Sequence, residues 1–181
     1  MKKKLLLHSC CAPCTSGVLW QLDDYDITLY FYNPNIDTLD EYDRRLTALE
    51  EYISAYNSEN GKNIEIIAPS YNHEEFSPKI TGLENEKEGG NRCSICFSIR
   101  LDSTANYASL NGFDLFATTL TVSPHKNYEV INKIGDSIAE KYKVNYLSSN
   151  FKKNNGYLTS IQNSRKYRIY RQNYCGCNPN L

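Results

Sequence analysis

The sequence predicts an α/β fold: a parallel sheet with helices on both faces and cysteine-rich loops at the strand ends. Short apolar runs alternate with longer segments of helical periodicity, which is typical of parallel sheets. The first run, residues 5–7, is apolar at every position, as expected of a strand that is buried on both faces. With 181 residues and no internal repeat, the chain is expected to form a single domain over residues 1–181.

The first half of the chain contains three of the expected strands. The strand at 5–7 enters a tight turn with three cysteines, and a first helix is expected over 16–22. Residues 33–35 read Asn-Pro-Asn, which is turn chemistry. The other elements expected in this half are a strand over 27–32, a helix over 37–57 that ends before Gly61, and a strand over 64–67.

The second half begins with a polar stretch at about 70–91. This stretch contains three glycines and is expected to be a mobile connection. The elements expected after it are a helix from 92 to about 108, a strand over 113–119 with a loop over 120–124, a helix over 127–142 and a strand over 144–147. The remaining residues, about 150–181, are expected to form a basic, tyrosine-rich tail.

The charge composition limits the nucleic-acid contacts that the chain could make. The formal net charge is −1, so binding to RNA or DNA would need a local basic patch. Residues 165–174 are a candidate, because arginine and lysine are interleaved there with tyrosine, a mixture suited to phosphate contacts and base stacking. Lys126, Lys152 and Lys153 would extend this patch. The alternative is a solvated helix face, which the run by itself slightly favours.

The amino terminus and the cysteine usage indicate a cellular compartment. The basic start is followed by an apolar run that stops after Leu7, and no stretch reaches membrane-spanning length. We therefore expect a cytoplasmic protein with no membrane contact. Clustered cysteines in that compartment usually serve metal binding or redox chemistry.

Two cysteine groups together predict a metal site. Cys10, Cys11 and Cys14 follow the first strand, at the end where open α/β sheets bind ligands. Cys93 and Cys96 begin a helix, whose free N–H groups and dipole favour thiolates. Four thiolates suit either zinc or an iron–sulfur cluster, and the spacing does not distinguish the two. The alternative is that these cysteines are structural or form disulfides.

The remaining pair, Cys175 and Cys177, is separated by one glycine. Such a pair can close a small, strained disulfide ring, and strain makes a disulfide easier to reduce, as catalytic and regulatory disulfides are. The two residues could instead be further metal ligands or belong to a frayed tail.

The loop after the first strand also bears on the choice of substrate. It reads Cys-Cys-Ala-Pro-Cys, whereas nucleotide-hydrolysing versions of such a fold need a glycine-rich, phosphate-binding loop at this point. This argues against ATP use. Residues 118–126 are rich in hydroxyl groups and could bind a polar substrate, but a lone histidine such as His125 is more often structural than catalytic.

Motifs that span nearly the whole chain resemble, in the same order, those of a known family. The first reads LHSCCAPC over residues 7–14 and the last reads YRQNYCGC over residues 170–177. The motifs between them are Tyr32-Asn33-Pro34-Asn35-Ile36, Glu41-Tyr42 with Arg45, Arg92-Cys93 with Cys96 and Arg100-Leu101, Thr118-Thr119-Leu120, Ser123-Pro124 and Lys126-Asn127. Together they resemble the non-cobalamin epoxyqueuosine reductase family (QueH-type). The chain departs from the family pattern at Thr38, Asn72 and Asn150, where Pro, Asp and Asp are usual.

The resemblance implies a Rossmann-like domain related to the adenine-nucleotide hydrolase group. It implies an iron–sulfur oxidoreductase that reduces epoxyqueuosine to queuosine at the wobble position of tRNA, the final step of queuosine biosynthesis. Carried over by motif, Cys10, Cys11, Cys93 and Cys96 would hold a [4Fe–4S] cluster. Cys175 and Cys177 would form the redox-active pair. Cys14 would be left for a second metal ion, an iron or a zinc that has replaced it.

The same resemblance, with the basic run, implies the partners and the substrate-binding residues. The partners are tRNAs with a GUN anticodon, those for Asp, Asn, His and Tyr, and an electron donor that the sequence does not identify. The substrate-binding residues would be Arg45, Arg100, Lys126, Arg168, Tyr170, Arg171 and Gln172. Two other classes of protein remain open: a metal-free thiol–disulfide oxidoreductase and a zinc-stabilised tRNA-binding module.

Overall fold

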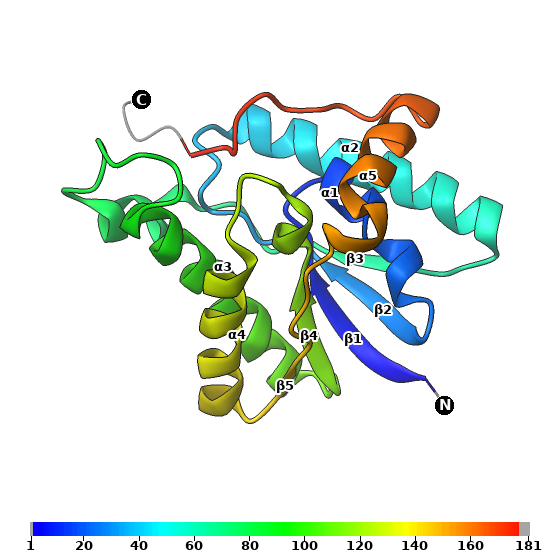
Figure 1. The fold of residues 1–181 in the computed structure, drawn as a ribbon, viewed down its shortest axis with the longest axis horizontal. Coiled ribbons are helices and arrows are strands. Elements are labelled where there is room, and N and C mark those ends of the chain that lie inside the picture. The colour runs from blue at the N-terminus through cyan, green and yellow to red at the C-terminus, as the bar shows by residue number, and fades with distance from the viewer. Residues whose placement is uncertain (1, 178–181) are drawn as a thin grey trace.

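The structure, a computed structural model that describes residues 2–177, contains one sheet of five parallel strands in the order β3-β2-β1-β4-β5 (Figure 1). The α/β fold class expected from the sequence is thereby confirmed. The strands are β1 (Lys3–His8), β2 (Tyr25–Tyr30), β3 (Glu65–Ile67), β4 (Leu115–Thr118) and β5 (Asn145–Tyr146). The helices are α1 (Ala12–Ser16), α2 (Leu39–Asn60), α3 (Asn91–Leu110), α4 (Tyr128–Tyr142) and α5 (Gly156–Lys166).

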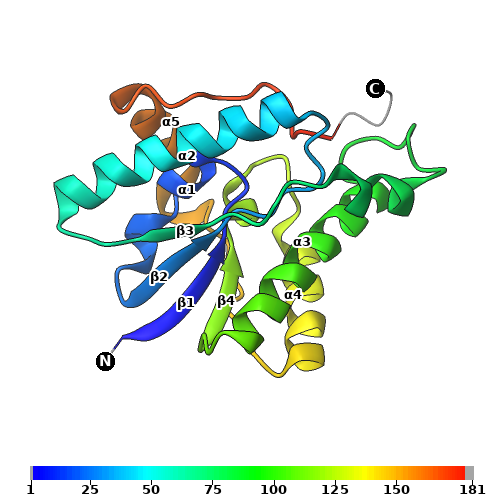
Figure 2. The same cartoon turned by 180° about the vertical axis from the view of Figure 1, so that it is seen from behind.

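Helices cover both faces of the sheet, as Figures 1 and 2 show from opposite sides. Leu5 and Leu7 of β1 pack into the core beneath α1 and α2, whereas Leu6, between them, packs into the core beneath α3 and α4. All three side chains are completely buried. Because successive side chains of a strand point to opposite faces, an uninterrupted apolar run is what a central strand between two helical layers requires.

The order of the strands reverses beside β1. β2 and β3 follow in sequence on one side of it, and β4 and β5 lie on the other. The carboxyl ends of β1 and β4 therefore meet at a topological switch point, which is where open α/β sheets bind their ligands. The cysteines that follow His8 begin at this position.

The long helix α2 has defined signals at both ends. The Thr38 hydroxyl accepts a hydrogen bond from the backbone N–H of Glu41, which caps the amino end and makes threonine suitable there in place of proline. Gly61 ends the helix with φ of 60°, a left-handed conformation that glycine adopts without a side-chain penalty.

The first helix differs from its expected position at 16–22. It begins already at Ala12, inside the cysteine loop, and Leu19–Leu22 forms a separate 3₁₀ turn. Pro13 explains the early start, because proline in the first turn of a helix loses no hydrogen bond and has a suitable φ. Cys14 is consequently a helical residue rather than a loop residue.

The tail contains a helix, α5, that its polar composition did not reveal. Its buried positions are Gly156, Ser160 and Ser164, small residues spaced four apart, and this face packs against α1. The contact is close: a Cβ added at Gly17 would lie 2.4 Å from the carbonyl oxygen of Gly156. Small residues on both helices are what allow the two backbones to approach.

This contact gives a stability prediction. Gly17 has φ of −83°, so alanine there would be strained only by its collisions with the Gly156 backbone and with the Cβ of Ser160. We expect Gly17→Ala to lower the free energy of unfolding by about 1–3 kcal/mol, the usual range for overpacking. Urea denaturation measures it, with Ser58→Ala on the exposed face of α2 as the control. An unchanged urea midpoint would contradict the close approach of α1 and α5.

The polar connection at about 70–91 contains regular structure. It forms two 3₁₀ turns, His73–Glu75 and Ser77–Ile80, and it buries Phe76 and Ile80 against Cys96 of α3. The Asn72 side chain accepts a hydrogen bond from the N–H of Glu74 and so caps the first turn.

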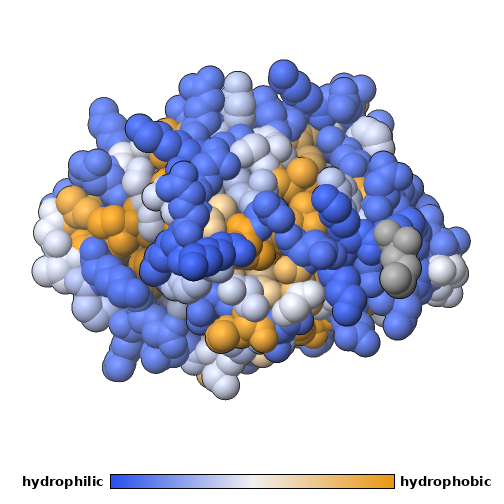
Figure 3. Space-filling view, turned by 90° about the horizontal axis from the view of Figure 1, so that it is seen from below, coloured by the Kyte–Doolittle hydropathy of each residue, from blue (hydrophilic) through white to orange (hydrophobic). Residues whose placement is uncertain are grey.

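None of the described helices is both long enough and apolar enough to cross a bilayer. On the face at the amino ends of the strands, apolar residues form separate spots with hydrophilic residues between them (Figure 3).

Candidate functional site

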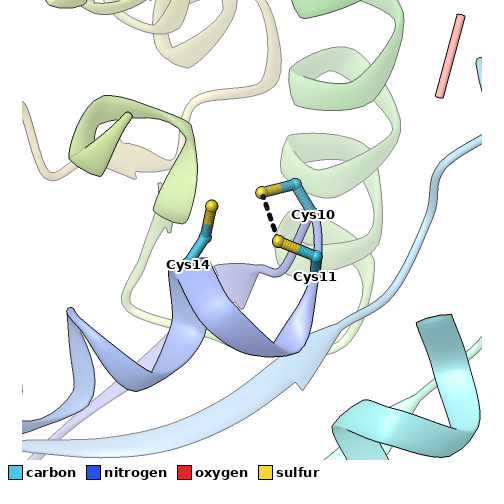
Figure 4. Close-up of side chains that lie close together, drawn as sticks. All are labelled: Cys10, Cys11 and Cys14. Carbon is cyan, nitrogen blue, oxygen red and sulfur yellow. Dashed lines mark hydrogen bonds between the residues drawn. The ribbon is translucent and has the colours of Figure 1, made fainter. Parts of the chain in front are cut away.

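Three cysteine side chains converge directly after β1. The Sγ atoms of Cys10, Cys11 and Cys14 all lie within 4.8 Å of one another, and those of Cys10 and Cys11 are 3.8 Å apart. Figure 4 shows the three sulfurs pointing toward a common centre, two from the end of the strand and one from α1. Three thiols at this separation could bind one metal ion together.

Thr119, directly after the other strand of the switch point, also holds this cysteine group in place. The backbone N–H of Cys10 donates to the Thr119 hydroxyl at 3.2 Å, and that hydroxyl lies 3.4 Å from the Cys10 sulfur, to which it donates. Thr119 directly follows β4, the strand beside β1. The cysteine loop is therefore connected to both strands that border the switch point.

The three thiols differ in acidity because they interact with one another. Hydrogen bonds from Cys11 and Cys14 hold the pKa of Cys10 well below its usual range, and nearby Lys126 lowers it further. The hydrogen bond with Cys10 raises the pKa of Cys11 to about 12, and the pKa of Cys14 is raised for the same reason. The geometry thus concentrates thiolate character on Cys10. Cys11 and Cys14 keep their protons, which a bound metal ion would displace.

Lys126 is the lysine that lines both pockets of this site. Burial lowers the pKa of its ammonium group, but electrostatic interactions with Cys10, Cys14 and Cys175 outweigh burial and raise that pKa overall. The cysteines of the first group and of the tail thus lie close enough to Lys126 to stabilise its charge. Lys126 remains protonated at neutral pH.

A second thiol group lies at the start of α3. Cys93 and Cys96, with Cys175 and Cys177 of the tail, line a small pocket of about 40 Å³. The Cys93 sulfur accepts a hydrogen bond from the backbone N–H of Gly89 at 3.2 Å. Burial raises the pKa of Cys96, and burial likewise raises that of Cys177, to about 12.

A larger pocket of about 420 Å³ adjoins the small one. Cys11, Cys14 and Cys175 are among its lining residues. Four residues line both pockets: Glu88, His125, Lys126 and Cys175. The seven cysteines, all of them free thiols, are thus gathered from the amino end, the middle and the tail around a shared space next to Lys126.

A still larger hollow lies elsewhere. It measures about 690 Å³, lies between α3 and α4, and is lined by polar residues that include Asp102 and Lys133. No cysteine is among its lining residues. We place the candidate site at the thiol pockets because chemistry, rather than size, distinguishes a reactive site.

The residues expected to bind substrate fall into two groups. Arg168 and Arg171 are exposed, and Arg171, Gln172 and Lys126 line the larger pocket. Arg45 and Arg100, in contrast, are 2% and 4% exposed.

The buried group makes internal contacts. The guanidinium of Arg100 donates to the carbonyl oxygen of Cys96 at 3.3 Å, and Arg100 also lines the small pocket. The hydroxyl of Tyr170 donates to the carboxylate of Glu41 at 3.0 Å. Arg45 donates to Glu41 and to the tail. Arg100 and Arg45 thus each contact the backbone of a cysteine, Cys96 and Cys175 respectively.

Several residues around the site carried no assigned role in the sequence analysis. Glu88 and Tyr157 line the larger pocket, and Glu41 pairs with Arg45. Tyr157 comes from α5, and the spacing of Gly156, Ser160 and Ser164 was the one signal that could have revealed that helix. Glu41 and Arg45 are four apart on α2, a spacing typical of a helical ion pair.

Comparison with known proteins gives a consistent result. Residues 5–179 match the family model described as "Epoxyqueuosine reductase QueH". A protein of Streptococcus pyogenes serotype M1 with that name is 45% identical over 98% of this chain and 70% of its own length. A protein of the same name from Staphylococcus epidermidis is 44% identical over 97% of this chain and 75% of its own length. The one from Thermotoga maritima is 36% identical over 96% and 88%.

Proposed function

The chain belongs to the epoxyqueuosine reductase QueH family, and from this premise we propose that it reduces epoxyqueuosine to queuosine in tRNA with an iron–sulfur cluster. The reaction removes the epoxide oxygen as water and leaves a carbon–carbon double bond. It consumes two electrons and two protons, which an external donor of low potential and the solvent must supply. The observation that carries this proposal is the convergence of seven free thiols beside Lys126.

The donor set fits the proposed cofactor. We assign the [4Fe–4S] cluster to Cys10, Cys11, Cys93 and Cys96, because Cys10 and Cys93 pack against the same core beneath α3 and the pockets lined by Cys11 and Cys96 adjoin. When bound, such a cluster supplies electrons one at a time and a Lewis-acidic iron. We assign Cys14 to a second metal ion, since its sulfur lies in the same group as those of Cys10 and Cys11.

Lys126 is proposed to bind the oxygen that leaves. Its ammonium group lines the larger pocket, and the raised pKa keeps it charged at neutral pH. A charged donor next to the pocket would form a hydrogen bond that strengthens as negative charge develops on the epoxide oxygen. His125 lines the same pocket and lies next to it in sequence.

Cys175 and Cys177 are proposed as the redox-active pair. Two thiols release two electrons and two protons when they form a disulfide, which equals the demand of one epoxide. The external donor then reduces the disulfide again. Cys175 lines both pockets and is therefore the thiol of the pair that reaches both the cluster ligands and the substrate space.

The basic tail is proposed to position the anticodon loop of a tRNA with a GUN anticodon. Arg168 is exposed, and Arg171 is exposed at the wall of the larger pocket, so both can contact phosphates. Tyr174 is 38% exposed and lines the same pocket, where its ring can stack on an unpaired base. We expect the protein to act in the cytoplasm, where its tRNA substrate is found.

An anaerobic assay tests the proposed function. The protein is purified without oxygen, analysed for iron, sulfide and zinc, and incubated with dithionite and tRNA from cells that accumulate epoxyqueuosine. We expect iron and sulfide in the protein and queuosine in the nuclease-digested tRNA, measured by mass spectrometry. A colourless protein without iron would favour the thiol–disulfide oxidoreductase. Zinc with tRNA binding but without conversion would favour the tRNA-binding module.

A single substitution tests the placement of the tRNA. Arg171→Ala is expected to weaken tRNA binding and to reduce the slope of log K against log salt concentration by about 1, because one phosphate contact is lost. Filter binding over a salt series measures both. Lys3→Ala is the control and should leave the slope unchanged. It removes the same charge at the amino end of β1, whereas the cysteine site follows the carboxyl end of that strand. Equal slopes for Arg171→Ala and the unmodified protein would refute the placement.

A further inference from the structure

The tail that contains Cys175 and Cys177 is bound to α2 through its backbone. Arg45 donates one hydrogen bond to the carbonyl oxygen of Cys175 at 3.1 Å and another to that of Tyr174 at 3.3 Å. The next carbonyl, that of Gly176, accepts from the backbone N–H of Asp37 at 2.9 Å. Three successive carbonyls are therefore fixed, while Cys175 lines both pockets and Cys177 lines the small one.

Arg45 is itself held in place. Its Nε donates to the Glu41 carboxylate at 2.7 Å, and the two side chains are only 2% and 9% exposed. The same carboxylate accepts from the Tyr170 hydroxyl, so Glu41 contacts the tail at a second point. Each donor of the guanidinium that points at the tail thus has a defined acceptor, as a buried charge requires.

Gly176 shows that the contact tolerates no side chain. Its φ is 104°, a conformation that glycine adopts freely and other residues rarely do. A Cβ added there would lie 2.9 Å from Nη1 of Arg45 and 3.1 Å from Cγ1 of Ile36. The glycine between the two cysteines thus allows the tail to pack directly onto the guanidinium.

We propose that Arg45, oriented by Glu41, is a positioning residue that fixes the Cys175–Cys177 thiol pair beside the cluster ligands and the substrate pocket. This inference rests on the proposed function, in which that pair transfers electrons. We propose this role in place of substrate binding by Arg45, because the guanidinium already donates hydrogen bonds to Glu41 and to two tail carbonyls. A positioning residue acts on the reaction step, whereas a substrate-binding residue acts on affinity.

The test measures kcat and KM for tRNA in variants on both sides of the contact. Arg45→Lys keeps the positive charge but loses the planar fork whose three nitrogens donate to Glu41 and to the two carbonyls, and Gly176→Ala disturbs the same contact from the tail. We expect each to lower kcat about 10-fold or more, with KM for tRNA within about 2-fold of the unmodified value. Ser54→Ala, at an exposed position of the same helix, is the control and should change neither constant.

A second readout separates positioning from a general loss of structure. The rate of maleimide modification of Cys175 and Cys177 is measured by mass spectrometry, together with the urea midpoint and the iron content. We expect modification to become at least about 3-fold faster in both variants, because an unanchored segment is more accessible, while iron content stays unchanged. Unchanged kcat and modification rates in both variants would overturn the inference, as would a raised KM with unchanged kcat.

The proposed function and the positioning role of Arg45 are contradicted by different results. If the unmodified protein does not convert epoxyqueuosine, the proposed function fails, and the modification rates still show whether Arg45 holds the tail. If the unmodified protein converts it and Cys175→Ser does not, but Arg45→Lys and Gly176→Ala retain full kcat, the positioning role alone is overturned.

Discussion

Replacing Cys10 with serine is expected to abolish binding of the proposed iron–sulfur cluster and to lower turnover by at least about 100-fold, the upper end of the range for losing residues that only support metal ligands. Cys10 carries the thiolate character of its group, and the Thr119 hydroxyl and Lys126 stabilise that charge. A serine alkoxide is far harder to form, so the site would lose its strongest ligand. Iron and sulfide analysis, visible absorption and the tRNA assay measure the loss.

Cys14→Ser is the matched control for this prediction. Its sulfur belongs to the same group, but we assign it to a second metal ion rather than to the cluster. We therefore expect this variant to keep the sulfide content and visible absorption of the cluster and to lose only one metal ion per chain. If Cys14→Ser loses the cluster and Cys93→Ser keeps it, the cluster is held by the three amino-terminal thiols, and the assignment of Cys93 is wrong.

Cys175→Ser is expected to produce a comparable loss of turnover, about 100-fold or more, while the cluster remains. Without its thiol the pair cannot form a disulfide, so the two electrons cannot be released together. Cys175 also lines both pockets, so its loss affects the contact between them. Multiple-turnover assays with iron analysis of the same samples measure this effect.

Cys177→Ser provides the companion experiment. A redox pair acts as a unit, so removing either thiol should cost about as much as removing both. Full turnover in Cys175→Ser, Cys177→Ser and the double variant, with the cluster present, would show that the tail thiols do not take part in electron transfer.

Most of the fold could be predicted from the sequence because local patterns encode it. The apolar run at residues 5–7 indicated a central strand, and Gly61 correctly marked the end of α2. α5 was missed because its buried face consists of small and polar residues, which produce no apolar periodicity. The start of α1 was placed too late because Cys11, Ala12 and Pro13 were interpreted as part of a turn.

The site was predictable only in part, for a different reason. Strand ends and a helix start indicated where Cys10 and Cys93 would lie, since those positions follow from the topology of an α/β sheet. The return of the tail onto α2 joins Arg45 to Cys175 across 130 residues, and no local pattern encodes such a contact. The motif that contains Arg45 therefore gave no sign that this side chain lies buried against the tail.

The long separation between Arg45 and Cys175 has a consequence for biosynthesis. During translation, every thiol up to Cys96 leaves the ribosome well before the final pair does. The thiols of a growing chain are thus accessible to metal before Cys175 and Cys177, which also line the pockets, have been synthesised. A metal bound by the earlier thiols at that stage would be covered only when the segment with Cys175 and Cys177 packs onto α2.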